Sequence, residues 1–139
     1  MTPSHWLLKT EPGTYSYSEL VKTKTTQWDL VRNFQARNYL RKMAKGDLAL
    51  IYHSGDERAV VGLARIVKEA YPDPDPDGGD WSQVDIQSLK AMVRSISLTE
   101  IKETSALKDM LLIKQSRLSV MPVSAPHFET LLRLGGISV

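Results

Sequence analysis

The hydrophobic and polar positions near the N-terminus predict a strand followed by a helix. The segment from His5 to Lys9, with its apolar centre WLL, is typical of a buried strand, and the Glu-Pro-Gly turn at 11–13 ends it. Ser16 and Glu19 have the spacing of a capping box, in which the serine hydroxyl accepts a bond from a backbone N–H and the glutamate reaches back to the cap. A short helix is therefore predicted through residues 20–21.

A second helix is predicted to begin near Asn33. Asparagine is favoured at the N-cap, and apolar side chains follow it at helical spacing. Gly46 is placed to end this helix. The apolar runs 47–53 and 59–70, which are joined by a short polar turn, then predict a β-hairpin.

The segment 71–80, with the sequence YPDPDPDGGD, interrupts this pattern. Its prolines fix φ and remove backbone donors, so we predict an exposed loop. Strands are predicted over 81–87 and 92–98, and short helical turns follow them. A last helix is capped by Ser124 and ends at the glycine pair 135–136.

These elements predict an α+β fold in which short helices surround a curled or barrel-like, largely antiparallel sheet. No repeat or linker divides the chain, so residues 1–139 are predicted to form one domain. No glycine-rich phosphate loop accompanies the strands, and a doubly wound nucleotide-binding fold is not expected.

Composition narrows the chemistry more than the fold. The chain has no cysteine, which excludes disulfides, thiolate nucleophiles and Cys-ligated metal centres. The histidines are scattered and the aspartates of 73–80 lack the EF-hand pattern, so we expect no metal and no cofactor. No apolar run approaches the ~20 residues of a membrane span. We expect a cytoplasmic monomer that has no membrane partner.

The formal net charge of +2 points to no partner, but the charges are unevenly placed. Segment 32–45 carries five basic residues and no acidic one, whereas the charged residues of segment 73–85 are all aspartates. A basic segment attracts phosphate, and an ordinary solvated helix face has the same pattern. Both interpretations stay open on charge alone.

Tryptophans near basic residues suggest a site for nucleobases, which stack on aromatic faces with a gain of ~1–3 kcal/mol each. Trp6 lies inside an apolar strand and is expected in the core. Trp28 precedes the basic segment and fits a core or a pocket position equally. Trp81 follows the proline-rich loop and fits a lid or an anchor.

Five stretches, taken together and in order, resemble the EVE domain family. They are 6–12 (WLLKTEP), 28–38 (WDLVRNFQARN), 46–62 with its GD, IYHS and VVG motifs, 71–74 (YPDP) and 115–123 (QSRLSVMPV). The resemblance covers about residues 5–132. It implies a PUA-like fold, a small mixed β-barrel flanked by short helices. It also implies a nucleic-acid-binding module, in which a pocket takes a flipped, modified base of the methylated-cytosine type from DNA or RNA.

The resemblance also implies roles for individual residues. Trp28 would form an aromatic wall, Asn33 would bond the edge of the base through its amide, and Arg37 would face phosphate. The other residues that the resemblance places around the pocket are Lys9, Glu11, Tyr52, His53, Ser54, Arg117, Leu118, Ser119 and Pro122.

Leu30 is the departure from the family pattern that bears on the pocket, and two other functions stay open. Leu30 stands where the family usually has glycine after Trp-Asp, and its side chain would narrow access beside Trp28 or alter the turn. One alternative is an enzyme acting on a modified base or nucleoside, like the amidohydrolases among ASCH domains, with Lys9 and Glu11 as an acid–base pair. The other is a protein-interaction module that uses loop 72–80.

Overall fold

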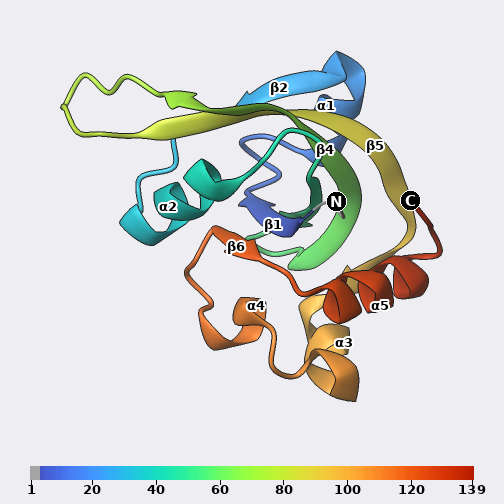
Figure 1. Cartoon of the computed structure of the whole chain (residues 1–139). Coiled ribbons are helices and arrows are strands. Elements are labelled where there is room, and N and C mark those ends of the chain that lie inside the picture. The colour runs from blue at the N-terminus through green and yellow to red at the C-terminus, as the bar shows by residue number, and fades with distance from the viewer. Residues whose placement is uncertain (1–3) are drawn as a thin grey trace.

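The computed structural model describes residues 4–139 and consists of one curved sheet with short helices around it (Figure 1). The strands are β1 (His5–Thr10), β2 (Thr25–Trp28), β3 (Leu48–His53), β4 (Ala59–Pro72), β5 (Ser82–Ser97) and β6 (Val120–Pro122). The helices are α1 (Tyr17–Thr23), α2 (Phe34–Lys42), α3 (Leu98–Glu103), α4 (Leu111–Lys114) and α5 (Ala125–Gly135), with a 3-10 turn, η1 (Ser105–Leu107), between α3 and α4.

The sheet is mixed and open. Its strand order is β2-β5-β4-β3-β1-β6, with β1 parallel to β3 and every other pair antiparallel. The α+β prediction is confirmed, but the sheet does not close into the barrel that we expected. The edge strands β2 and β6 are short, with four and three residues, and each pairs with a single neighbour, so they do not pair with each other.

The long strands β4 and β5 bend around β1 (Figure 1). Their ladder contains several register shifts, which mark bulges, and bulges bend and twist a strand. We predicted two strands in the region of β5, whereas one strand continues from Ser82 to Ser97. Residues 88–91, which separate the two predicted strands, lie in the bulged part of this ladder.

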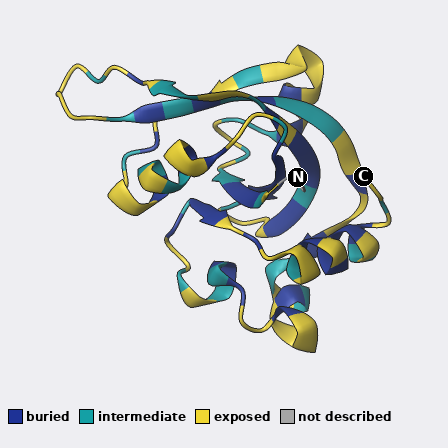
Figure 2. Ribbon diagram, in the orientation of Figure 1, coloured by how far each residue is buried: buried dark blue, intermediate teal, exposed yellow. Residues whose placement is uncertain are grey.

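The core lies on the inner side of the bend, where β1, β3 and the first half of β4 each contribute several buried residues (Figure 2). Trp6 is 5% exposed, which confirms its predicted place in the core. Its indole N–H donates to the buried carboxylate of Asp47 at 2.9 Å. The phenol of Tyr17 packs against Gly62, and its O–H donates to the carbonyl of Leu63 at 2.8 Å.

Most predicted helix caps are present. Ser16 and Glu19 form the complete capping box of α1, and the Ser124 hydroxyl accepts the N–H of His127 at the start of α5. Gly136 ends α5 in the left-handed conformation, with φ of 76°. The stop predicted at Gly46 was too late, because α2 ends at Lys42 and Gly46, with φ of 96°, lies in the turn into β3.

Candidate functional site

A cavity of about 360 Å³ opens between the end of β1, the edge strand β2 and the segment that follows β2. Small-molecule sites have volumes of roughly 300–1,000 Å³, so this cavity can take a small planar ligand. Of the predicted site residues, Lys9, Trp28 and Ser119 line it. The complete lining is Lys9, Thr10, Thr14, Tyr15, Thr26, Gln27, Trp28, Asp29, Leu30, Val31, Arg32 and Ser119.

Trp28 provides an aromatic wall of this cavity. It is the last residue of β2, paired with Val84 of β5, and only 8% of it is exposed. The ring of Tyr15 meets it edge-on, with the two centroids 6.3 Å apart and the planes at 79°. The Tyr15 N–H donates to the carbonyl of Glu11 at 2.9 Å, which fixes the turn after β1. The pairing of β2 and this turn therefore preorganise two aromatic rings.

Lys9 brings an ammonium group to the same cavity from β1. Its Nζ donates to the backbone carbonyl of Ser116 at 2.7 Å and lies 5.6 Å from the centre of the Tyr52 ring. Burial lowers the pKa of Lys9, because desolvation disfavours the charged form. The backbone N–H of Lys9 also donates to the carbonyl of Ser119 at 2.9 Å, which joins β1 to the segment before β6.

A second cavity of about 370 Å³ adjoins the first through this contact with Ser116. Three further predicted residues, Asn33, Arg117 and Leu118, line this second cavity. They do not line the first cavity, which we call the Trp28 cavity. Asn33 caps α2, since its Oδ1 accepts the N–H of Ala36 at 2.9 Å. Apart from Leu118, the lining is polar and basic; the complete lining is Asn33, Gln35, Lys114, Gln115, Ser116, Arg117 and Leu118.

The end of β3 does not reach either cavity. Tyr52 and His53 are buried, and Ser54 donates its backbone N–H to the carbonyl of Thr10 at 2.9 Å. Nε2 of His53 accepts the N–H of Tyr17 at 3.0 Å, and its Nδ1 bonds a carboxylate oxygen of Glu57 at 2.8 Å. These bonds place the ring proton on Nδ1 and make the imidazole a link between β3 and α1.

Glu11 and Pro122 also lie outside the lining of both cavities. The Glu11 carboxylate accepts the N–H of Gly13 at 3.2 Å, whereas Lys9 bonds Ser116, so the two side chains do not form the acid–base pair that an enzyme would need. Pro122 belongs to β6 and pairs with Trp6 of β1. Within residues 4–139, no group of three or more metal-ligating side chains comes together.

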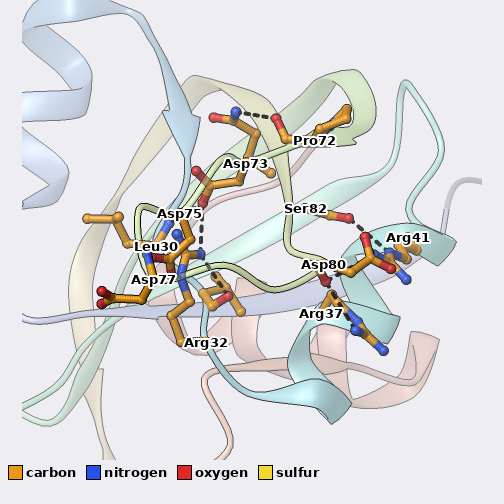
Figure 3. A network of polar contacts seen from close by, with 12 residues as sticks. Leu30, Arg32, Arg37, Arg41, Pro72, Asp73, Asp75, Asp77, Asp80 and Ser82 are labelled. Carbon is orange, nitrogen blue, oxygen red and sulfur yellow. Dashed lines mark hydrogen bonds and ion pairs between the residues drawn. The ribbon is translucent and has the colours of Figure 1, made fainter.

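The segment after Trp28 is fixed by the loop that joins β4 to β5 (Figure 3). Arg32 donates from Nη1 to Asp73 at 2.9 Å and from Nε to Asp75 at 2.8 Å. The N–H of Leu30 donates to the same Asp73 oxygen at 2.8 Å. Asp73 is 7% exposed, so these contacts compensate for the desolvation of its charge. The Asp77 N–H and the Arg32 side chain lower the pKa of Asp75.

Two arginines of α2 contact the same loop (Figure 3). Arg41 pairs with Asp80 at 2.8 Å and donates to the Ser82 hydroxyl at 2.9 Å. Arg37 donates to the Asp80 carbonyl at 3.1 Å and lies outside both cavity linings. The proline-rich loop is therefore docked on the basic segment. Two arginines of the basic segment, Arg32 and Arg41, form ion pairs with aspartates of this loop, which the charge pattern of the sequence did not predict.

The sequence left several cavity residues undetected. Thr26 and Gln27 belong to β2, which we did not predict because it is short and only Trp28 in it is buried. Tyr15 follows the turn after β1, where no periodicity marks its direction. Arg32 carried no local signal of its contacts, since its partner Asp73 is 41 residues away.

The protein-family model described as the EVE domain matches residues 4–134. The chain belongs to the EVE domain family. Human thymocyte nuclear protein 1 is 39% identical to it, over 94% of this chain and 73% of the human protein.

Several solved structures share the fold of this EVE domain, among them the two that follow. A hypothetical protein from Leishmania major superposes with a TM-score of 0.92 at 39% identity, over 97% of this chain and 96% of that one. The human THYN1 protein in complex with 5-methylcytosine containing DNA superposes with a TM-score of 0.87 at 37% identity, over 98% and 99% of the two chains. Within residues 4–139 of this EVE domain, no helix is long and apolar enough to cross a membrane.

Proposed function

We propose that this EVE domain binds nucleic acid and takes up a modified base, such as 5-methylcytosine, in the Trp28 cavity after the base leaves its stack. The observation that supports this most is the position of Trp28, whose ring is fixed by β-pairing at the wall of a cavity of about 360 Å³. The human relative solved with 5-methylcytosine containing DNA supports the ligand class.

The cavity offers the groups that a flipped cytosine-type base needs. Stacking of the base on Trp28 would contribute ~1–3 kcal/mol and would help to offset its removal from the duplex. The carboxylate of Asp29 is exposed in the lining and can accept a bond from an exocyclic amino group. Val31 offers an apolar surface for a methyl group, and Lys9 and Arg32 add positive charge.

The second cavity would face the backbone of the same strand. Lys114 and Arg117 are exposed there, and its lining contains no acidic residue. Asn33 lies in the same lining and directly follows Arg32 of the first cavity in sequence. We propose that a phosphate beside the flipped base is bound at Arg117, and that Asn33 bonds the sugar or the base edge.

Fluorescence polarisation with labelled DNA and RNA oligonucleotides tests this proposal. Each oligonucleotide carries either one 5-methylcytosine or one cytosine at its centre. We expect tighter binding of a methylated oligonucleotide, and we expect Trp28→Ala to remove the difference while Trp28→Phe keeps part of it. Equal affinity of the wild type for every oligonucleotide, or full discrimination by Trp28→Ala, would contradict the proposal. Circular dichroism checks that each variant is folded.

The phosphate contact has its own signature. Counterion release makes the logarithm of the binding constant fall linearly with the logarithm of salt concentration. Arg117→Ala should reduce this slope by about 1, without changing the preference for the modified base. Lys24→Ala, an exposed lysine outside both cavity linings, is the matched control and should keep the slope.

A further inference from the structure

Two large apolar side chains are exposed beside the Trp28 cavity. Within residues 4–139, Leu30 is 72% exposed and Phe34 is 65% exposed. Leu30 itself lines the cavity. Phe34 begins α2, and its sequence neighbours Asn33 and Gln35 line the second cavity. Such side chains expose apolar area to water at the place where a ligand would enter.

The backbone presents Leu30 rigidly. Its φ is 62°, in the left-handed region that costs a residue with a side chain about 1–2 kcal/mol. A strained residue persists only when its surroundings fix it, and here its N–H is bonded to the buried Asp73, which also binds Arg32. The backbone of Leu30 is therefore held in place, and its exposed side chain projects from a fixed Cα.

Phe34 is fixed in a similar way by its neighbours. Its ring stacks on Trp81, with the centroids 5.2 Å apart and the planes at 16°. The guanidinium of Arg37 lies 5.0 Å from the centre of the Phe34 ring and 6.0 Å from that of Trp81. The guanidinium carbon of Arg32, which also pairs with Asp73, lies 5.4 Å from the centre of the Trp81 ring. The result is an aromatic ridge with positive charge, next to the cavity.

We propose that Leu30 is a wedge that enters the base stack of a double helix when the target base moves into the Trp28 cavity. This rests on the proposed function. Removal of a base leaves an apolar gap between its neighbours, and proteins fill such gaps with apolar side chains. Leu30 lies at the rim of the cavity that takes the base, so it is within reach of the gap. The Phe34–Trp81 ridge then packs on the flanking nucleotide.

If Leu30 is a wedge, the binding of duplex DNA depends on it, whereas the binding of a single strand does not. A single strand has no continuous stack to interrupt, and its base can enter the cavity without a side chain in its place. Positive charge on the ridge from Arg37 suits the phosphates that flank the gap. Leu30 would thus select between forms of the nucleic acid, whereas Trp28 selects the base.

The test compares binding to the same 5-methylcytosine sequence as a duplex and as a single strand. Leu30→Asn removes the apolar side chain and keeps a residue type that tolerates positive φ, and Leu30→Ala removes the side chain alone. Val93→Ala is the control, because Val93 is 82% exposed and lies outside the linings of the Trp28 cavity and the adjoining cavity. We expect both Leu30 variants to bind the duplex about tenfold more weakly, and the single strand within about twofold of wild type.

The duplex also carries 2-aminopurine beside the target base, and its fluorescence should rise when wild type unstacks it but not with Leu30→Asn. Unchanged duplex binding by both Leu30 variants would overturn the wedge. Equal losses on duplex and single strand would also overturn it, since Leu30 would then only shape the cavity. If wild type binds neither form, the proposed function itself fails.

Discussion

The backbone N–H of Leu30 donates to Oδ2 of Asp73 at 2.8 Å, which joins two segments 43 residues apart in the sequence. Asp73 also binds the side chain of Arg32, so one buried carboxylate fixes both ends of the turn after Trp28. The loop that carries Asp73 thereby determines the shape of the cavity rim.

Leu30→Gly should stabilise the protein. The left-handed conformation costs a residue with a Cβ roughly 1–2 kcal/mol, which glycine avoids. The greater flexibility of glycine in the unfolded chain offsets roughly 0.5–1 kcal/mol of this gain in stability. We expect the free energy of unfolding in urea to rise by about 0.5–1 kcal/mol. Leu30→Ala keeps a Cβ at this position and should bring no gain; equal stability of the two variants would contradict this explanation.

Asp73→Ala should destabilise the protein clearly. The substitution leaves the Leu30 N–H and the Arg32 guanidinium without their buried acceptor, and hydrogen bonds to charged groups contribute about 1.5–3 kcal/mol. We expect a loss of about 2 kcal/mol in the free energy of unfolding. Asp77→Ala lies in the same loop with an exposed side chain and is the control. A loss no larger than that of the control would argue against the anchoring role of Asp73.

Acid should weaken the docked loop through Asp75. The N–H of Asp77 and the side chain of Arg32 favour the carboxylate, so the pKa of Asp75 in the folded protein lies below its ordinary value of 3.8. A lowered pKa stabilises the fold above the unfolded value, and this contribution is lost as the pH falls through the folded pKa. Urea unfolding at a series of pH values from 5 to below 3 should show a steeper loss in wild type than in Asp75→Asn. Parallel curves would rule out this contribution.

Gly62→Ala should destabilise the sheet. A Cβ at this position would clash with the Tyr17 ring, so the ring would have to shift and its bond to Leu63 would be disturbed. Overpacking of this kind costs about 1–3 kcal/mol. Thermal unfolding compares it with Gly13→Ala, where a Cβ would make an ordinary contact at 3.6 Å with Glu11. A melting temperature of Gly62→Ala equal to that of Gly13→Ala would contradict the packing argument.

Local sequence signals predicted much of the fold. The capping box at Ser16, the caps at Asn33 and Ser124, and the hairpin of β3 and β4 all depend on neighbouring residues, and all are present. The strand β2 was missed because it is a short edge with one buried residue, Trp28, and therefore carries little apolar pattern.

The site was less predictable because its walls come from distant segments. Lys9, Trp28 and Ser119 line one cavity, whereas Asn33 and Arg117 line its neighbour. The prolines correctly indicated a loop from residue 73, but the predicted start at residue 71 is wrong, because β4 continues to Pro72 and pairs there with Ser82. Nothing local showed that the aspartate between the first two prolines turns inward to bind Arg32, because that contact is made across 41 residues.

The most direct test of the account uses the three tryptophan indole N–H signals in a ¹H–¹⁵N correlation spectrum. A single-stranded oligonucleotide with one 5-methylcytosine is titrated to saturation. We predict a large shift of the Trp28 signal, because the base stacks on its ring, and no shift of Trp6, whose indole is bonded to the buried Asp47. A Trp28 signal that stays in place while the oligonucleotide binds would contradict the account.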